Sequence, residues 1–598
     1  MSARTDPPLC YTVSAPACQT HRFEVRLRIA RPQRDQLVSL PVWIPGSYLV
    51  REFAKNLQGL CAYQNGQALP LEQLDKCTWK IGSRPDECCE ISYQIVAFDR
   101  SVRSAWLDTQ RGFFNGTSVC LRVHGQERLP HVLELPVQGY PPHWQAACAL
   151  PLLDGGVRGL GRYQARDYDE LVDSPVELGE FWQGQFDAYG VPHRVVVSGA
   201  PPGFDGSRLL ADIQAICRSQ IALWHPDHTA PPHDSYLFLI AAQDEGYGGL
   251  EHRASTALIV RRADLPRHGM KGAPSEGYTT VLGLVSHEYF HTWNVKRLRP
   301  AEFVRYDFAR ENYTELLWFF EGLTSYFDDL MLVRCGRIGE EDYLKLLART
   351  VNKVLQTPGR HIQSLARASR DAWIKFYRPD EHTPNTTVSY YDKGALLGLC
   401  LDLTLRQRHA SSLEALMRAL WQRCQGGPMT EDDVRAEITR LGDATLAQQV
   451  QRWVHECADL PVAACLQTVG VCYEFESTPR ALQLGLKAKE QQGVHITHVL
   501  RDSAAEAAGF APGDECLAVT LGQGRSARHW RVQRISDFDL LLDGVRRCQV
   551  WVSRDAQVLP LKLTLPAKPA AGVQTVRLRV ADAPRVRAWL RGSESALD

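Results

Sequence analysis

The sequence predicts a multidomain α+β protein with a β-rich first part, a mixed and then helical middle, and a β-rich last part. Three observations lead to this prediction. The chain has 598 residues, which is more than one hydrophobic core usually serves. Alternating apolar and polar residues dominate the beginning and the end of the chain. Helical spacing dominates between them. We therefore expect four segments, at 1–172, 173–310, 311–465 and 466–598.

The composition indicates a soluble globular protein with no general attraction for nucleic acid. Hydrophobic residues make up 44% of the chain, and Lys plus Arg equals Asp plus Glu at 68 each. No apolar run approaches the ~20 residues of a membrane span, and the first residues have no signal-peptide pattern. The 17 cysteines include no CxxC pair. We expect buried thiols in a reducing compartment and therefore a cytoplasmic protein.

Strand patterns fill the first segment. Residues 23–29 alternate between apolar and charged side chains, and residues 89–96 alternate in the same way. Further strands are expected at 37–44 and 118–123, with turn residues such as Pro45-Gly46-Ser47 between strands. Repeated short strands with turn signals predict an antiparallel β-sandwich. No catalytic cluster is visible here, so we expect this segment to have a structural role.

The second segment mixes strands and helices. Buried strands are expected at 194–198 and 235–240, with a helix at 208–224 between them. The histidine-rich loop at 225–233 makes a second metal site conceivable. Its prolines and polar residues favour an exposed loop instead.

The most informative stretch is Ser286–Trp293, which contains His-Glu-x-x-His. On a helix, His287 and His291 lie one turn apart on the same face and can bind one metal ion. Glu288 is placed to take a proton from a water on that metal, which is the zincin arrangement. The surrounding helix is apolar nearly all round and is therefore expected to be buried. Buried His and Glu side chains need partners, and one zinc ion supplies them.

The third segment is predicted to be helical. The metal-binding helix begins near Thr279, at the end of the second segment. After it, apolar residues recur with helical spacing along the third segment. The expected helices are 314–332, 391–403, 413–424, 431–441 and 447–457.

A catalytic zinc normally has three protein ligands, so a third must come from a later element. The candidates are Glu311, Glu315 and Glu321. Glu321 follows Trp-Phe-Phe on an apolar helix, where we expect an acid to be buried away from solvent. Glu311 lies in a polar stretch and Glu315 lacks the aromatic setting, so we favour Glu321.

Several motifs together resemble the glycyl aminopeptidase family of zinc metallopeptidases (gluzincins, peptidase family sixty-one). They are residues 287–297, residues 318–327 and Trp43–Tyr48. The C-terminal segment resembles a PDZ domain. The resemblance implies a thermolysin-like catalytic domain in which the helical third segment is one half. It also implies removal of small N-terminal residues, Gly and Ala, from peptides by a Glu-assisted zinc-bound water.

Two further motifs carry over from the related aminopeptidase N type enzymes. Gly248-Gly249-Leu250-Glu251-His252 is similar to their Gly-x-Met-Glu-Asn motif, although Leu and His replace Met and Asn. The resemblance implies that Glu251 binds the substrate's free α-amino group while Gly248 and Gly249 let the peptide add along an edge strand. Residues 389–395 resemble the Tyr-x-Lys-Gly segment of those enzymes. Tyr391 is the implied oxyanion donor, with Tyr390 as the alternative.

The last segment reads as a strand at 493–499, a short helix at 503–509, and a turn and strand at 511–519. Leu484-Gly485-Leu486 is a candidate carboxylate-binding loop of the PDZ-like domain, where backbone N–H groups would receive a peptide C-terminus. The alternative is that this domain only packs on the catalytic part.

Three functions remain open from the sequence. The first is a zinc aminopeptidase acting on peptides with a free N-terminus. The second is a zinc endopeptidase with the same site but no amine anchor. The third is an inactive scaffold that binds peptide tails through the PDZ-like domain. The intact Glu288 and Tyr391 disfavour the scaffold, and Glu251 distinguishes the two peptidases.

Overall fold

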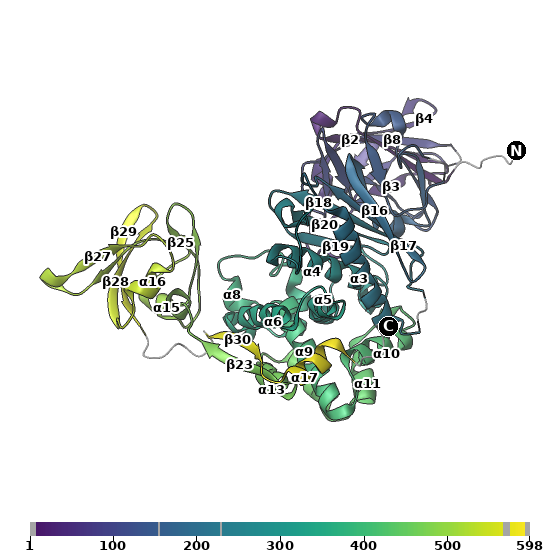
Figure 1. Ribbon diagram of the computed structural model, residues 1–598. Coiled ribbons are helices and arrows are strands. Elements are labelled where there is room, and N and C mark those ends of the chain that lie inside the picture. Colours follow the sequence, from purple (N-terminus) through teal and green to yellow (C-terminus); the bar gives the residue numbers. More distant parts are fainter. Residues whose placement is uncertain (1–6, 86, 154–155, 228–229, 566–573, 593–598) are drawn as a thin grey trace. The chain divides into compact units, whose positions relative to one another are not determined.

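The computed structural model describes the chain except for residues 1–6, 86, 154–155, 228–229, 566–573 and 593–598 (Figure 1). The chain divides into two compact units. The first unit comprises residues 1–313, 334–338 and 421–429, and the second comprises 314–333, 339–420 and 430–598. No helix within the described ranges is both long and apolar enough to cross a membrane. All 17 cysteines are free thiols.

The first unit begins with a β-rich region of three sheets. Neighbouring strands of the largest sheet run antiparallel, except that β1 and β12 are parallel. Its order is β14 (Arg162–Ala165), β12 (His131–Glu134), β1 (Leu9–Ser14), β2 (Arg22–Ile29), β8 (Cys89–Val96), β4 (Leu57–Gln64) and β5 (Gln67–Ala68). One smaller sheet has the order β13 (Gln145–Ala147), β15 (Val176–Gly179), β10 (Arg111–Phe114) and β9 (Ala105–Leu107). The other has the order β11 (Arg122–Val123), β3 (Gln36–Ser39), β7 (Thr78–Ile81) and β6 (Leu71–Gln73).

The strand predictions in this region are confirmed where apolar and charged residues alternate, and one fails where they do not. β2 and β8 match the two alternating stretches. The strand expected at 118–123 is wrong, because α1 (Gly116–Val119) is a helical turn and only Arg122–Val123 pairs as a strand. All four residues of α1 are buried. Residues 118–121 are also all buried, so the alternation in this stretch does not mark one buried face of a strand.

A mixed sheet follows in the same unit and supports the helix that carries the His-Glu-x-x-His motif. β17 (Val191–Ser198), β18 (Tyr236–Gln243) and β20 (Ser255–Arg261) are parallel. The edge strands β16 (Phe181–Ala188) and β19 (Gly248–Glu251) run antiparallel to their neighbours. Helices α3 (Gly206–Trp224) and α4 (Glu276–Phe290) pack against this sheet and each other (Figure 1).

The central strand β18 is buried on both faces, and its alternate residues divide between two neighbours. Leu237 and Leu239 belong to the hydrophobic core that the sheet shares with the N-terminal strands. Tyr236 and Phe238 face the other way, and their rings lie 4.9 and 5.8 Å from the ring of Tyr289 on α4. Burial on both faces explains why the strand reads as a continuous apolar run.

The second unit is mainly helical before its C-terminal sheet. Trp318–Gly322 form a π-helical turn that leads into α5 (Leu323–Arg334), so the helix expected from 314 begins four residues later. The remaining helices include α6 (Glu340–Leu355), α7 (Leu365–Arg370), α9 (Tyr390–His409), α11 (Glu431–Leu441), α12 (Ala444–His455) and α13 (Val462–Thr468). α10 (Leu413–Arg423) spans the boundary between the two units.

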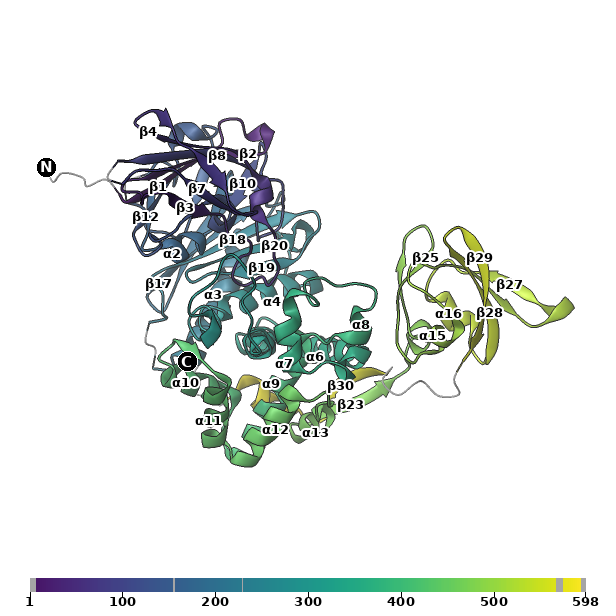
Figure 2. The same ribbon diagram turned by 180° about the vertical axis from the view of Figure 1, so that it is seen from behind.

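The C-terminal sheet has a hydrophobic core of its own. Its order is β24 (Leu486–Glu490), β25 (Val494–Val499), β26 (Glu515–Leu521), β28 (Arg547–Arg554) and β29 (Gln557–Thr564), with β27 (Arg528–Arg531) also paired to β26. The short helices α15 (Ala504–Ala508) and α16 (Asp537–Leu541) accompany it (Figure 2). Outside this sheet, β23 (Val471–Glu476) pairs with β30 (Thr575–Val580).

Candidate metal and peptide site

Helix α4 places the two histidines of the motif one turn apart. Its first turn is capped by Ser275, whose hydroxyl accepts the Tyr278 N–H at 3.1 Å. The helix ends at Phe290, and His291 still has right-handed helical dihedral angles as the C-cap. The rings of His287 and His291 are 4.7 Å apart and nearly perpendicular. The expected pairing of these side chains on one face is therefore present.

A backbone contact fixes the orientation of His291. Its Nδ1 lies 2.8 Å from the carbonyl oxygen of Asn294, in the turn that follows the helix. A proton on Nδ1 donates to this carbonyl and leaves Nε2 with its lone pair. This is the arrangement that neighbouring groups impose on metal-binding histidines. The side chain is only 1% exposed, so the ring is held by its surroundings.

Two carboxylates converge on this histidine. Glu251 at the end of β19, Glu288 on α4 and His291 each offer a ligand atom, and these atoms lie within 4.8 Å of one another. Glu251 and Glu288 are 4% and 5% exposed. Two buried carboxylates at this separation repel each other and favour a bound cation. A metal ion and a substrate ammonium are cations that such a donor set fits.

Glycines allow the two carboxylates to approach the backbone. A Cβ at Gly249 would overlap the carboxylate of Glu288. A Cβ at Gly46 would lie 2.5 Å from Oε1 of Glu251, and Gly46 has a φ of +91°, which only glycine adopts readily. The sequence marks Gly46 only as a turn residue and as part of a family motif. Its role beside Glu251 required the fold, because the two residues are 205 positions apart in the chain.

Asp173 ties the end of β19 to the segment after α4. Its Oδ1 accepts from Nζ of Lys296 at 2.8 Å and lies 3.0 Å from Nδ1 of His252. Its Oδ2 accepts the N–H of Arg253 at 3.0 Å. Because His252 and Arg253 directly follow Glu251, this carboxylate holds the chain that positions the amine-anchor candidate. Sequence reasoning missed Asp173, which lies in no recognisable motif, and assigned no role to Lys296, although Lys296 lies within the motif at 287–297.

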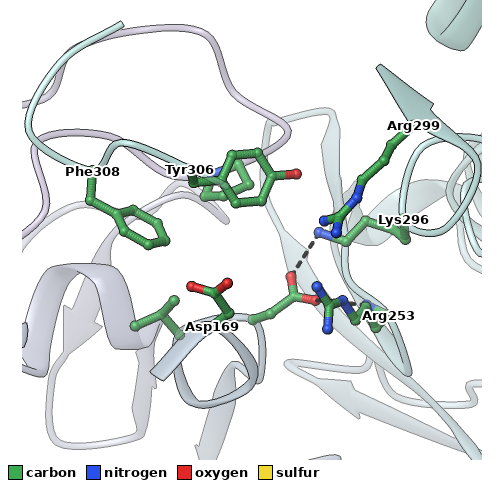
Figure 3. Close-up of a pocket in the computed structure, with 9 residues that line it drawn as sticks. Asp169, Arg253, Lys296, Arg299, Tyr306 and Phe308 are labelled. Atoms are coloured by element: carbon green, nitrogen blue, oxygen red, sulfur yellow. Dashed lines mark hydrogen bonds and ion pairs between the residues drawn. The ribbon is translucent and has the colours of Figure 1, made fainter. Parts of the chain in front are cut away.

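Lys296, Arg253 and Arg299 line a small pocket (Figure 3), and Asp173, the ion-pair partner of Lys296, lines it as well. Burial alone would raise the pKa of Asp173, but the Lys296 ammonium and the contact with His252 hold it well below its ordinary value. Burial has the opposite effect on Lys296 and lowers its pKa. The nearby Asp173, Tyr306 and Glu251 outweigh this effect, so the pKa of Lys296 lies above its ordinary value. Both groups are therefore charged near neutral pH.

In the second unit, Glu321 is the candidate third ligand. It lies in the π-helical turn and is 2% exposed. Of the alternatives, Glu315 is exposed and Glu311 is partly exposed. Single π-helical turns occur frequently at functional sites. Burial therefore favours Glu321 over the two alternatives, as the aromatic setting of the sequence indicates.

Tyr391 lies near Glu321 within this unit, at the start of α9. Burial, and then the charge of Glu321, raises the pKa of the Tyr391 hydroxyl well above its ordinary value. The hydroxyl is therefore protonated and able to donate a hydrogen bond. The alternative, Tyr390, is fully buried, and its ring packs 4.8 Å from that of Phe376. Tyr391 is partly exposed, as a substrate-binding side chain must be.

A pair of glycines brings α9 and the π-helical turn together. A Cβ at Gly322 would lie 2.5 Å from Cα of Gly394, and one at Gly394 would lie 2.8 Å from Cα of Gly322. Such contact between backbones excludes any larger residue at either position. It accounts for the glycines in both sequence motifs of this unit and places Glu321 near the start of α9.

Leu484, Gly485 and Leu486 lie where the chain enters the C-terminal sheet. The N–H groups of Leu484 and Gly485 donate to the carbonyls of Arg480 and Leu482, both at 2.9 Å. Two of the three expected donors are therefore engaged within the chain, and this conformation does not favour their binding a peptide carboxylate. The sequence had suggested this site because the Leu-Gly-Leu pattern does not reveal the preceding helical turn, α14 (Arg480–Gln483).

The histidine-rich loop also differs from expectation. His233 is buried, and its Nε2 lies 3.5 Å from the hydroxyl of Tyr289. His225 is partly buried and accepts the indole N–H of Trp293 at 2.8 Å. His228 lies outside the described residues. His233 therefore packs against α4 and His225 against Trp293 just after it, whereas Pro226, Asp227 and Ala230 of the same loop are exposed as predicted.

Comparisons with known proteins bear on both units. The peptidase M61 N-terminal domain matches residues 10–180, and the M61 glycyl aminopeptidase domain matches residues 280–397. Neither range includes the C-terminal sheet, so its PDZ resemblance stays a prediction. No curated protein matches the chain.

Solved structures extend this similarity. An aminopeptidase N family protein from Idiomarina loihiensis is 35% identical, with a TM-score of 0.91, over 97% of this chain and 100% of that one. An M1 zinc metallopeptidase from Deinococcus radiodurans is 15% identical, with a TM-score of 0.47, over 76% of this chain and 94% of that one. Identity of this extent to the Idiomarina protein, together with both domain matches, identifies the family. The chain belongs to the peptidase M61 family.

Proposed function

We propose that this chain is a zinc-dependent aminopeptidase that removes small N-terminal residues, Gly and Ala, from peptides. The observation that carries the proposal is the convergence of Glu251, Glu288 and His291 in one buried cluster. Glu288 and His291 belong to the peptidase motif. Glu251 adds a second carboxylate, which an endopeptidase does not need. Membership of the M61 family supports the preference for Gly and Ala.

The residues proposed to hold one zinc ion are His287, His291 and Glu321. The two imidazoles and one carboxylate are a donor set that zinc prefers, and the lone pair of His291 Nε2 is available for it. When bound, zinc supplies a Lewis acid that polarises the scissile carbonyl and acidifies water. Glu321 is assigned by its burial and its sequence setting.

The protein's own groups then account for the rest of the reaction. Glu288 takes a proton from the attacking water and returns it to the leaving amine. The protonated hydroxyl of Tyr391 donates a hydrogen bond to the developing oxyanion. Glu251 binds the α-ammonium of the substrate, so that cleavage falls after the first residue. Gly248 and Gly249 let the peptide lie against β19 as an added strand.

The cysteines along the chain suit a reducing compartment. All 17 thiols are free, and we propose a cytoplasmic location on that basis. The segments 1–172, 173–310, 311–465 and 466–598 are proposed as the domains of the enzyme. The engaged N–H groups of Leu484 and Gly485 give no support to a second function in binding peptide tails.

The test compares wild type with Glu288→Gln on Ala-p-nitroanilide, with zinc content measured in both proteins. The variant is expected to keep about one zinc per chain and to lose ~10²–10⁴-fold in kcat, because only the proton transfer is removed. Equal turnover by the two proteins would refute the role of Glu288. Full wild-type activity after removal of zinc by a chelator would refute the metal assignment.

A further inference from the structure

Arg103 lies beside the strand on which the peptide is proposed to bind. Its Nη2 donates to the carbonyl oxygen of Gly249 at 3.2 Å. Its Nη1 lies 3.5 Å from the position that a Cβ of Gly248 would occupy. The guanidinium group therefore borders both glycines of β19. Arg103 itself belongs to a loop that lies more than 140 residues before this strand in the sequence.

The loop that carries Arg103 is held in place by its own hydrogen bonds. The Asp99 carboxylate accepts the N–H of Ser101 at 2.8 Å, and the Ser101 hydroxyl accepts the N–H of Arg103 at 3.3 Å. The buried amide of Asn115 donates to the carbonyls of Val102 and Ser104. Arg103 is therefore presented from a fixed backbone, which lowers the entropy lost when it binds a ligand.

The guanidinium retains unused binding capacity. Its Nε is buried and has no hydrogen-bond partner among the described residues. Among the residues that the structure describes, no carboxylate forms an ion pair with Arg103. A guanidinium has five N–H donors in a planar fork, which matches the two oxygens of a carboxylate. A partly buried arginine without an acid partner is suited to an anionic ligand.

The direction of β19 indicates which part of a substrate reaches Arg103. The strand runs from Gly248 to Glu251, so a peptide anchored by its amine at Glu251 and paired antiparallel to the strand runs back past Gly249 toward Gly248. An extended peptide advances about 3.3 Å per residue. Glu288 packs against Gly249, so the first peptide bond falls there. The carboxylate of a second and final residue then lies beside Gly248 and Arg103.

We propose that Arg103 binds the C-terminal carboxylate of dipeptide substrates and so makes the enzyme favour dipeptides with small first residues. This inference rests on the proposed aminopeptidase function, and Glu251 and Arg103 bind the two ends of one short substrate. A carboxylate in this position forms charge-assisted hydrogen bonds with guanidinium N–H groups that do not bond to Gly249. Arg103 is then a determinant of substrate length and takes no part in the chemical step.

The experiment measures kcat/KM for Ala-Ala, for Ala-Ala amide and for Ala-p-nitroanilide. The amide differs from the dipeptide only in lacking the terminal charge, and the anilide reports the chemistry at the first residue. The proteins are wild type, Arg103→Gln and Arg103→Lys. Arg100→Gln is the matched control, because Arg100 lies in the same loop and its guanidinium packs 4.6 Å from the ring of Trp106.

Wild type is expected to prefer Ala-Ala to its amide by ~10–100-fold, the range that hydrogen bonds to a charged group supply. Arg103→Gln should remove this preference and leave the amide and anilide within about twofold of wild type. Arg103→Lys should restore part of it, and Arg100→Gln should change none of it.

Two results would overturn the inference while leaving the aminopeptidase intact. One is equal wild-type kcat/KM for Ala-Ala and its amide, which shows that the carboxylate is not bound. The other is an equal loss on all three substrates in Arg103→Gln, which shows that Arg103 only supports the backbone of β19. No wild-type cleavage of any of the three substrates would instead refute the proposed function, and this inference with it.

Discussion

The contact between Gly46 and Glu251 makes a direct prediction about Gly46→Ala. The added Cβ would lie 2.5 Å from Oε1 of Glu251, whereas ordinary van der Waals contact begins at about 3.4 Å. The carboxylate must therefore move by about 1 Å. A displacement of this size at a positioning group costs ~10²-fold in rate. We expect kcat/KM for Ala-p-nitroanilide to fall by about that factor.

The control must share the backbone strain of this variant without its contact. Gly46 has a φ of +91°, and alanine there costs ~1–2 kcal/mol in stability whatever its neighbours. Gly66 has a φ of +77° in the turn between β4 and β5, and a Cβ there would meet nothing within 4 Å. Gly66→Ala should therefore lose similar stability and keep full activity.

The assay is steady-state hydrolysis of Ala-p-nitroanilide, with thermal unfolding measured on the same samples. We expect both variants to unfold at a lower temperature than wild type and only Gly46→Ala to lose activity. A kcat/KM of Gly46→Ala within about threefold of that of Gly66→Ala would refute this expectation. In that case Glu251 either moves without consequence or does not anchor the substrate.

Two further predictions concern groups on either side of the proposed reaction. Tyr391→Phe should lower kcat by ~10²-fold, which is the effect of removing one oxyanion donor. Tyr390→Phe, at a buried tyrosine, should leave kcat unchanged. The reverse result in the same kinetic assay would assign the role to Tyr390. Asp173→Asn should lower the free energy of unfolding by ~3–5 kcal/mol at pH 7, because Lys296 is left buried without its partner, and a denaturant titration that finds no loss would contradict this. Since the pKa of Asp173 is lowered by folding, its contribution to stability is present above the unfolded carboxyl pKa of about 3.9 and is lost as the pH falls through the lower folded value; the difference between wild type and variant should therefore shrink in acid.

Local patterns predicted much of the fold. Alternation predicted β2 and β8 because each strand has one buried face. Helical spacing predicted α3, which has a buried face, and α9, which is buried along most of its length. The patterns failed where burial was complete, as in α1, because total burial removes the difference between faces. They also missed the π-helical turn at Glu321, which differs from an α-helix by a hydrogen-bond shift that composition does not reveal.

The candidate site divides in a similar way. His287, Glu288 and His291 follow from spacing along one helix, so the sequence alone predicts their pairing. Gly46, Asp173, Lys296 and Arg103 approach the end of β19 only through folding over long sequence separations. No periodicity marks them. The expected exposure of His233 failed for the same reason, since its burial depends on its contact with Tyr289 on α4.

We propose that Glu251 anchors a free α-amine beside a metal-dependent peptidase centre. The most direct measurement is digestion of one Ala-initiated peptide in free and N-acetylated form, with the products identified by mass spectrometry in the presence and absence of a chelator. We predict that the free peptide loses single residues from its N-terminus, that the chelator stops this loss, and that the acetylated peptide stays intact. Cleavage of both forms at the same internal bond would contradict the claim and indicate an endopeptidase.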